Sequence, residues 1–264
     1  MQPSELARRR DIAATLAVKA AARAARMRDA GLGEASLKGA QDFLTAADGA
    51  TETFLREQLA RHFPGEDILG EEQGGPQGSD LDPAGPLWVL DPIDGTSNFA
   101  RGGDRWCVSI GMVLDGRAVV GAIARHAPAD IFAGARGCGA TLNGAPIRAA
   151  STTDLSRATV EIGWSLRRPL VDFVGLVDRV MAAGAGMRCA GSGSLGLVET
   201  AAGRLDAYLE PHINSWDAAA ALAIAREAGC WMNDFESGDW LAHGNPIAFA
   251  APALGPTLGA MMRA

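Results

Sequence analysis

The stretch Trp88–Thr96 reads WVLDPIDGT and joins an apolar strand pattern to two acids that are three positions apart. Pro92 has no N–H group to donate to a sheet, so we expect the strand to end there, and Gly95 permits a tight turn. The carboxylates of Asp91 and Asp94 repel each other unless a cation neutralises them or one of them stays protonated. A turn in which Asp94 caps a following helix explains the same residues without any ligand. This stretch by itself does not distinguish a cation site from a helix cap.

Other acids favour the cation hypothesis. Glu71 follows a short apolar segment, and Asp217 opens a predicted helix, 216–228, where the helix dipole favours negative charge. With Asp91 and Asp94 they offer hard oxygen ligands from separate strand and helix ends, a set that suits Mg²⁺. The four histidines lie in unrelated contexts and do not compete as ligands. A site with two such ions would activate water and stabilise the leaving oxygen of a phosphoryl displacement.

The composition is that of a folded, acidic protein. The 264 residues include 24 Lys and Arg against 31 Asp and Glu, which gives a net charge of −7. Hydrophobic residues make up 48% and charged residues 21%, values that are not typical of disordered chains. An acidic chain without a long basic tract is poorly suited to bind nucleic acid through its phosphates. We therefore predict no nucleic-acid partner.

Three sequence features bear on location. No run of 18 or more apolar residues is present, so no membrane span is expected. Residues 1–29 are rich in Ala and Arg and lack the compact apolar stretch and cleavage site of a secretory signal. The four cysteines are scattered and form no CxxC pair, which is typical of reduced thiols. These features predict a cytoplasmic protein without membrane contact.

The spacing of apolar residues predicts two helices followed by an antiparallel meander in the first half of the chain. The helices are expected at 4–29 and 48–62, and the strands at 68–70, 87–91, 108–114, 118–124 and 131–135. Asp115-Gly116 predicts a hairpin between the third and fourth of these strands, and Asn143-Gly144 marks another turn.

The second half alternates helices and strands, which favours layered α/β structure. Helices are expected at 170–183, 194–202, 216–228 and 253–263, and strands at 187–190, 206–209, 230–233 and 247–250. We place a soft boundary near residue 148. It separates an N-terminal α+β domain, 1–148, with most of the metal ligands from a C-terminal α/β domain, 149–264, with the substrate loop and the last ligand.

Three motifs in this order resemble the signatures of the inositol monophosphatase family: Gly70-Glu71-Glu72, the stretch 91–96, and Trp216-Asp217-Ala218-Ala219. The segments Lys38–Asp48 and Glu227–Gly229 resemble the family too, so the resemblance covers nearly the whole chain from about residue 37. It implies a layered α-β-α-β-α sandwich of the sugar-phosphatase type, within the α+β class. It also implies a Mg²⁺-dependent, lithium-sensitive phosphoric monoester hydrolase that forms a homodimer.

The resemblance gives each acid a metal role. Glu71, Asp91 and the backbone carbonyl of Ile93 would hold one Mg²⁺. A second ion would lie on Asp91, Asp94 and Asp217, and a third, weaker ion on Glu71. The count implied is two to three ions.

The resemblance also implies a catalytic and a phosphate-binding set. Thr96 with Asp48 would polarise the attacking water, helped by Glu71. The backbone amides of Gly95 and Thr96 would meet the phosphate, as amides at a helix start can. Asp48 and Thr96 also have ordinary helix-capping interpretations.

The loop Gly191–Gly196 is a literal GxGxxG pattern, GSGSLG. By itself it suggests a dinucleotide site, with Glu210 about the expected 20 residues downstream. A nicotinamide-dependent oxidoreductase is therefore a distant alternative. In the family, Ser192 and Gly193 would instead contact the substrate hydroxyls, Glu210 would accept a hydrogen bond from one, and Asp217 would also border the substrate.

Several pocket residues depart from animal-type members of the family. Gly193 stands where an alanine is usual, and Asn214-Ser215 replace a His-Cys pair. The expected reaction is hydrolysis of a small sugar or polyol phosphate, with inositol monophosphate as the first candidate. Histidinol phosphate, fructose 1,6-bisphosphate and 3′-phosphoadenosine 5′-phosphate stay open as alternatives, as does a non-catalytic relative that binds a phosphorylated metabolite.

Overall fold

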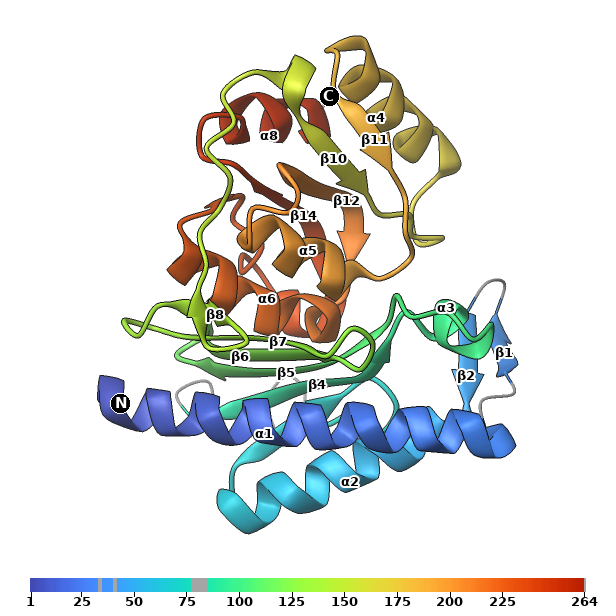
Figure 1. Ribbon diagram of the computed structural model, residues 1–264, viewed down its shortest axis with the longest axis vertical. Coiled ribbons are helices and arrows are strands. Elements are labelled where there is room, and N and C mark those ends of the chain that lie inside the picture. The colour runs from blue at the N-terminus through green and yellow to red at the C-terminus, as the bar shows by residue number, and fades with distance from the viewer. Residues whose placement is uncertain (33–34, 40–41, 77–84, 264) are drawn as a thin grey trace.

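The structure is a computed structural model that describes residues 1–32, 35–39, 42–76 and 85–263, and helices and sheets alternate in five layers (Figure 1). Helices α1 and α2 form the first layer, followed by a seven-stranded sheet, helices α5 and α6, a five-stranded sheet, and helices α4 and α8. The predicted layered α-β-α-β-α fold is therefore confirmed. The side chain of Lys38, in the segment that resembles the family, lies outside the described part.

The elements have the following bounds. The α-helices are α1 (Pro3–Met27), α2 (Ala46–His62), α3 (Thr96–Ala100), α4 (Leu170–Ala182), α5 (Gly193–Ala201), α6 (Ser215–Ala228), α7 (Trp240–His243) and α8 (Gly255–Arg263). The connections contain a π-helix, η1 (Arg28–Leu32), and a 3₁₀ helix, η3 (Leu155–Arg157). They also contain a two-stranded sheet formed by β1 (Ala35–Gly39) and β2 (Asp42–Thr45).

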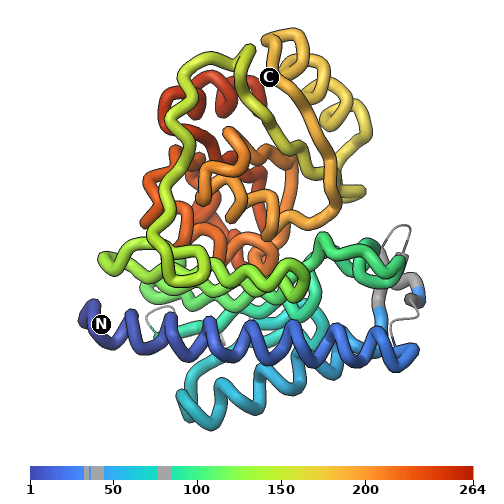
Figure 2. Tube along the Cα trace, in the orientation of Figure 1, coloured from blue at the N-terminus to red at the C-terminus, as the bar shows by residue number. Residues whose placement is uncertain are grey.

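The two larger sheets differ in topology. The seven-stranded sheet contains, in spatial order, β3 (Asp67–Gly70), β4 (Leu87–Asp94), β5 (Cys107–Leu114), β6 (Arg117–Arg125), β7 (Asp130–Ala135), β8 (Ala140–Leu142) and β9 (Ala145–Pro146). The five-stranded sheet contains β11 (Gly186–Arg188), β10 (Thr159–Ile162), β12 (Ala207–Ile213), β14 (Asn245–Ala250) and β13 (Trp231–Met232). The segment 147–158 carries the chain from one sheet to the other (Figure 2).

Three apolar clusters fill the spaces between the layers. The first joins α1 and α2 to one face of the seven-stranded sheet, and the second joins the other face to α5, α6 and the five-stranded sheet. The third lies between the five-stranded sheet and the helices α4 and α8. The middle cluster contains side chains from both halves of the sequence, so burial of apolar surface couples the two sheets.

A row of glycines lets α6 approach the seven-stranded sheet closely. Gly111, Gly121 and Gly134 pair across β5, β6 and β7. A Cβ atom at Gly121 would lie 2.0 Å from the carbonyl oxygen of Ala220, and one at Gly111 would lie 2.8 Å from the Ala219 Cβ. Any larger side chain in this row would push the helix away. The row therefore fixes where the N-terminus of α6 sits against the end of β4.

Every helix and strand that the sequence predicts is present, and no predicted end moves by more than four residues. The predicted hairpin at Asp115-Gly116 and the predicted turn at Asn143-Gly144 are both present, and Asp115 and Asn143 adopt the positive φ angles typical of such turns. The expectation that the first buried strand stops at Pro92 is wrong, because β4 continues to Asp94 with a register shift against β5 between Asp91 and Asp94. The irregular ladder removes the need for an N–H group at the proline.

Candidate active site

A cavity of about 630 Å³ lies where β4, α3, α5, β12 and α6 meet. It is lined by six of the predicted site residues, namely Glu71, Asp94, Ser192, Gly193, Glu210 and Asp217. The other predicted residues are Asp48, Asp91, Ile93, Gly95 and Thr96, and they do not line it. The predicted set therefore divides into residues that line the cavity and residues that do not, of which Asp48, Asp91 and Ile93 are buried.

Three carboxylates converge at the inner end of this cavity. Asp91, Asp94 and Asp217 each offer an oxygen, and these oxygens lie within 4.8 Å of one another. In a regular strand, residues three apart point to opposite faces. The register shift of β4 between Asp91 and Asp94 breaks that alternation and lets both acids face the same centre. The Ile93 N–H donates to Oδ1 of Asp91 at 3.0 Å and closes the local turn.

The third carboxylate comes from the N-terminus of α6. Asp217 is the third residue of that helix, and its Oδ2 accepts a hydrogen bond from the N–H of Asn214 at 3.2 Å. This capping interaction places negative charge at the positive end of the helix dipole. The close packing of α6 on the glycine row then brings Asp217 to Asp91, although 126 positions (217 − 91) separate them in the chain.

The N-terminus of α5 holds the second carboxylate. Asp94 accepts hydrogen bonds from the N–H groups of Gly193 at 3.2 Å and Ser194 at 3.0 Å, and from the Ser192 hydroxyl. The helix amides of the GxGxxG loop therefore bind a carboxylate of this chain. In a dinucleotide site they would face a pyrophosphate instead, so the oxidoreductase alternative is not favoured.

The turn after β4 is tied to the loop that precedes α5. Gly95 adopts φ 89°, and a Cβ atom there would lie 2.7 Å from the Arg105 carbonyl oxygen. The side-chain amide of Asn98 donates to the carbonyl oxygens of Arg105 at 2.9 Å, Ala190 at 3.0 Å and Gly191 at 3.2 Å. These bonds hold the Gly95 turn and the α5 loop in one fixed arrangement.

Asp48 and Thr96 lie together behind the carboxylate cluster. The Thr96 hydroxyl donates to the Ile93 carbonyl oxygen at 2.9 Å and lies 3.4 Å from Oδ1 of Asp48. Oδ2 of Asp48 accepts the backbone N–H of Thr45 at 2.8 Å and the Thr45 hydroxyl at 2.6 Å, which forms a capping box at the start of α2. Oδ2 of Asp48 thus accepts two capping hydrogen bonds, whereas Oδ1 lies near Thr96.

Burial and mutual repulsion raise the pKa of the clustered acids. Burial, followed by the charges of Glu71, Asp217 and Asp94, raises the pKa of Asp91 well above its usual value. Burial raises the pKa of Asp94, although the Ser192 hydroxyl bond lowers it. Burial and the charge of Asp94 raise the pKa of Asp217 to about 7. Full ionisation of this cluster is costly unless a positive charge lies among the carboxylates.

One oxygen of the cluster is unsatisfied in the described part of the chain. Oδ2 of Asp91 is buried and has no hydrogen-bond partner, a situation that costs free energy in a folded protein. A cation bound between the acids would satisfy this atom. The donor set is all oxygen, three carboxylates with the Ile93 carbonyl and Glu71 nearby, which fits a hard divalent ion such as Mg²⁺.

The outer part of the cavity contains residues that no sequence motif indicated. Trp164, Ser165 and Arg167 come from the loop after β10, and Tyr208 comes from β12. The Tyr208 hydroxyl donates to Oε2 of Glu210 at 2.6 Å. The periodicity of apolar residues predicts helices and strands but not which residues line a cavity. Only the tertiary fold brings these four side chains together. Trp164 lines the cavity although it belongs to no recognisable motif.

A group of ion pairs on two buried glutamates lies beside the cavity, and no sequence motif indicated it. Glu161, which lines the cavity, accepts bonds from Arg105 at 2.7 Å and Arg188 at 2.7 Å. Glu199 pairs with the same two arginines. Arg105 precedes β5 of the larger sheet, whereas Glu161 and Arg188 belong to the smaller one. The pairs therefore connect the two sheets at the edge of the site.

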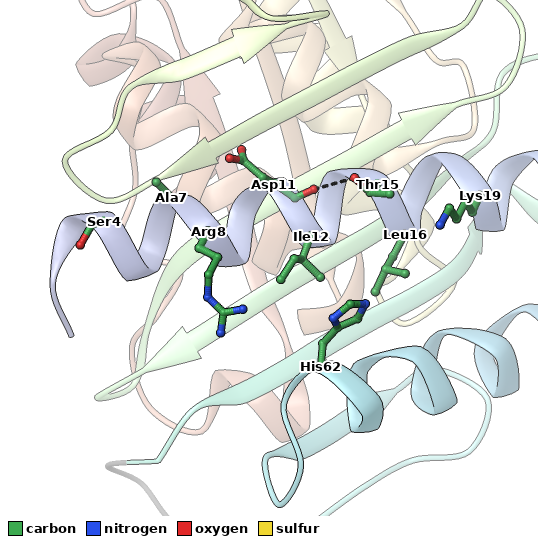
Figure 3. A pocket seen from close by; sticks show the side chains of 9 residues that line it. All are labelled: Ser4, Ala7, Arg8, Asp11, Ile12, Thr15, Leu16, Lys19 and His62. Atoms are coloured by element: carbon green, nitrogen blue, oxygen red, sulfur yellow. Dashed lines mark hydrogen bonds between the residues drawn. The ribbon is translucent and has the colours of Figure 1, made fainter.

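A second cavity of about 670 Å³ lies between α1 and the end of α2, and Figure 3 shows its lining. It contains Ile12 and Leu16 among polar side chains, and its acid Asp11 pairs with Arg10 at 2.8 Å. Within the described residues, the Asp91 cluster is the only group of three or more potential metal-ligating acids, histidines or cysteines. The first cavity is therefore the candidate active site.

Known proteins share this sequence and fold. The sequence model of the inositol monophosphatase family matches residues 5–260. The inositol-1-monophosphatase of Mesorhizobium japonicum is 34% identical over 239 residues, which are 88% of this chain and 89% of that protein. The Nus factor SuhB of Xylella fastidiosa is 37% identical over 204 residues, 76% of this chain and 72% of that protein. The structure of inositol monophosphatase from Anabaena has a TM-score of 0.82 and 31% identity, and the match covers 98% of this chain and 96% of that one.

The layered fold and the acidic cluster beside a cavity define a phosphate monoester hydrolase of the metal-dependent class. The chain belongs to the inositol monophosphatase family. Enzymes of this family act on small phosphorylated substrates, and the resemblance seen in the motifs is confirmed. None of the described helices is long and apolar enough to cross a membrane.

Proposed function

We propose that this protein is a Mg²⁺-dependent phosphomonoesterase that hydrolyses a small sugar or polyol phosphate, with inositol monophosphate as the first candidate. The observation that carries the proposal is the convergence of Asp91, Asp94 and Asp217 within 4.8 Å, together with a buried Asp91 oxygen that has no hydrogen-bond partner among the described residues. The 34% identity with an inositol-1-monophosphatase supports the choice of substrate.

Five groups of this chain would hold the ions. Glu71, Asp91 and the Ile93 carbonyl form one set, Asp91, Asp94 and Asp217 form a second, and Glu71 would hold a weaker third ion. When bound, the ions supply charge that activates water and neutralises the leaving oxygen of the phosphate ester. The cavity beside the cluster has room for a phosphorylated metabolite, since its volume falls in the range of small-molecule sites.

Thr96 and Asp48, helped by Glu71, would orient the attacking water and take its proton. Burial raises the pKa of Asp48 to about 6, against the Thr45 hydrogen bonds that lower it, so this carboxylate is close to the operating range of a general base. The Thr96 hydroxyl, 3.4 Å from Asp48, can pass a hydrogen bond between the carboxylate and the water. The amides of Gly95 and Thr96 would contact the phosphate oxygens.

The alcohol part of the substrate would occupy the outer cavity. Ser192, Gly193 and Glu210 line it, and Asp217 borders it on the side of the metal cluster. Ser192 and Gly193 donate to Asp94 in this structure, so their contact with a substrate hydroxyl would use their remaining hydrogen-bonding atoms. Glu210 would accept a hydrogen bond from one hydroxyl.

We further infer three properties from family membership: inhibition by lithium at a metal position, a homodimer, and a cytoplasmic location. The four cysteines are unpaired, in keeping with the last. The name Nus factor belongs to the relatives that carry it, and the net charge of −7 argues against direct binding of nucleic acid by this chain.

The test is phosphate release from inositol 1-phosphate with Mg²⁺, with EDTA and with added Li⁺. Histidinol phosphate, fructose 1,6-bisphosphate and 3′-phosphoadenosine 5′-phosphate are compared by kcat/KM under the same conditions. The expected result is Mg²⁺-dependent release that is highest for inositol 1-phosphate and is inhibited by Li⁺. A higher kcat/KM for another of these substrates would make that compound the preferred substrate in place of inositol 1-phosphate. No phosphate release from any of them would favour a protein that binds a phosphorylated metabolite without hydrolysing it.

A further inference from the structure

Tyr208 is the only tyrosine of the chain, and it lies buried at the cavity. Its hydroxyl donates to Oε2 of Glu210 at 2.6 Å. Residues two positions apart on a strand share a face of the sheet, so β12 presents both side chains to the same space. Tyr208 belongs to none of the motifs that carry the family resemblance, and its side chain is only 2% exposed.

Three glycines from two segments make room for this pair. A Cβ atom at Gly163 would lie 2.3 Å from both the Tyr208 hydroxyl and Oε2 of Glu210. A Cβ atom at Gly196 would lie 2.3 Å from Cδ2 of the tyrosine ring, and one at Gly193 would lie 3.3 Å from its hydroxyl. None of the three has a positive φ angle, so glycine is needed here for space and not for backbone conformation. The packing thus fixes the phenol against one oxygen of Glu210.

The two oxygens of Glu210 are not equivalent. Oε2 accepts the Tyr208 hydroxyl, whereas Oε1 receives no hydrogen bond from any described residue. Glu210 lines the cavity and is 7% exposed, so its carboxylate borders the space that the alcohol part of a substrate would fill. A carboxylate oxygen without a protein partner is available to accept a hydrogen bond from a ligand hydroxyl.

We propose that Tyr208 is a positioning residue that occupies Oε2 of Glu210 and leaves Oε1 to accept a hydroxyl of the substrate, which selects polyol phosphates over phosphate esters without such a hydroxyl. This role rests on the proposed function, because it concerns how Glu210 recognises the alcohol part of the substrate. Tyr208 does not touch substrate in this scheme and acts only through Glu210.

The charges around Glu210 show why the phenol matters. Burial and the charges of Asp217 and Asp94 raise the pKa of Glu210 to about 8, whereas the Tyr208 hydrogen bond and the charge of Arg167 lower it. Burial and Glu210 raise the pKa of Tyr208 well above its usual value, so the phenol keeps its proton and stays a donor. The charges of Glu161 and Asp94 raise the pKa of Tyr208 further, and burial with the charges of Glu161 and Glu210 raises the pKa of the Cys189 thiol. Loss of the phenol hydroxyl would favour a protonated Glu210, which is a poorer acceptor.

The kinetic test compares Tyr208→Phe with the unchanged enzyme on two substrates, inositol 1-phosphate and phenyl phosphate, which has no hydroxyl beside its phosphate. We expect KM for inositol 1-phosphate to rise roughly fivefold, the value of one ordinary hydrogen bond. The kcat for that substrate should change less than twofold, and both parameters for phenyl phosphate should stay the same. Equal changes for the two substrates would overturn the inference.

A double-variant cycle tests whether Tyr208 acts through Glu210. Glu210→Gln alone should also raise KM for inositol 1-phosphate, and adding Tyr208→Phe to it should have little further effect. Thr200→Val is the matched control, because it removes a buried hydroxyl on α5 that bonds the Gly196 carbonyl at 2.9 Å and does not touch Glu210. This control should leave the KM ratio of the two substrates unchanged. A full Tyr208→Phe effect in the Gln background would contradict the proposal.

A measurement without turnover separates this inference from the proposed function. Because Tyr208 is the only tyrosine, ¹³Cζ-labelled tyrosine gives a single NMR signal from the intact protein. We expect that signal to show a small step as Glu210 titrates, no phenol ionisation at pH 10, and loss of the step in Glu210→Gln. If neither substrate is hydrolysed, the proposed function fails, but this titration still shows whether the Tyr208 hydroxyl is hydrogen-bonded to Glu210. A phenol that ionises normally near pH 10 with no earlier step would overturn it.

Discussion

Oδ1 of Asp48 lies 3.4 Å from the Thr96 hydroxyl, although one residue opens helix α2 and the other follows strand β4. The same hydroxyl donates to the Ile93 carbonyl at 2.9 Å. Thr96 therefore connects a buried acid to an oxygen of the predicted metal set. This is the arrangement expected if a threonine relays between a carboxylate and the attacking water.

The Thr96→Val variant tests this relay. The substitution keeps the β-branched shape and removes the hydroxyl, so we expect kcat to fall roughly 100-fold, at the lower end of general-base effects. The melting temperature should change little, because Thr96 is only partly buried. Phosphate release and thermal unfolding of the same samples provide the comparison.

Thr51→Val is the matched control for that experiment. Thr51 lies on α2 one turn from Asp48, is buried, and its hydroxyl has no hydrogen-bond partner in the described part of the chain. Its replacement should keep kcat within twofold and keep or raise stability. If Thr96→Val were as active as Thr51→Val, the Asp48–Thr96 pair would be a capping feature and nothing more.

Asp91→Asn and Asp94→Asn should both abolish most activity but should move stability in opposite directions. No donor group of the described residues bonds Oδ2 of Asp91, so its amide variant relieves the repulsion from Glu71, Asp217 and Asp94 and should raise the melting temperature without Mg²⁺. Asp94 accepts bonds from Ser192, Gly193 and Ser194, and an amide NH₂ facing these donors leaves at least one unsatisfied. That variant should unfold at a lower temperature.

Both variants should lose orders of magnitude in kcat, because each removes a charged ligand. The loss should persist at saturating Mg²⁺ if the remaining acids cannot hold the ion in place. Near-normal turnover by Asp94→Asn would remove this residue from the mechanism. A lower melting temperature for Asp91→Asn would show that its unpaired oxygen has a partner in solution.

The raised pKa values make stability depend on pH in a defined direction. Asp48, Asp217 and Glu210 have pKa values of about 6, 7 and 8 in the folded protein, whereas unfolded Asp and Glu titrate near pH 4. Between those limits the folded protein holds more protons than the unfolded one, so the free energy of unfolding falls as pH rises. The contribution of these groups is fully present below about pH 4 and is lost by about pH 8.

Thermal unfolding in EDTA should show a melting temperature that drops by several degrees between pH 6 and pH 8.5. Mg²⁺ binds the ionised acids, so the stabilisation it adds should grow over the same interval. A melting temperature in EDTA that rises with pH, or a Mg²⁺ effect that shrinks with pH, would contradict the electrostatic description of the cluster.

The sequence predicted the layers well because their signals are local. The strand pattern of 87–91, the Asp115-Gly116 turn and the Ala-rich helix at 216–228 each contain their own periodicity or turn residues, and all are present. Strand β10 was missed because it spans only four residues, Thr159–Ile162, and includes a glutamate. That glutamate is buried by Arg105 and Arg188, contacts that no sequence window contains.

The site divides in the same way. The acids stand beside Gly, Pro and Trp in motifs, so the sequence revealed them. Tyr208, Arg167 and Trp164 reach the cavity only because β10 and β12 lie side by side in the smaller sheet. The residues around Pro92 do not by themselves predict that β4 extends past the proline, because the extension depends on a register shift against β5. That shift is what turns two acids, three positions apart, to one centre.

Gly193→Ala restores the residue that is usual in animal-type members of the family, and here it should be harmful. A Cβ atom at this position would lie 2.7 Å from Cδ1 of Ile213, too close for contact without movement. Ile213 is buried, so the methyl group has little room to move, and overpacking of this kind costs about 1–3 kcal/mol. We expect a lower melting temperature and a several-fold higher KM for inositol 1-phosphate, because Gly193 and Ile213 both line the cavity.

Ile213→Val removes the methyl group that the new Cβ atom would meet, so the double variant Gly193→Ala/Ile213→Val should recover most of the loss. Ile213→Val alone should cost about 0.5–1.5 kcal/mol, since it leaves a small void. The two substitutions are in contact, and their effects should therefore combine to less than their sum. Strict additivity in both melting temperature and KM would show that Ile213 is not what excludes alanine at this position, and that the glycine serves the Tyr208 hydroxyl, 3.3 Å from the same Cβ position, instead.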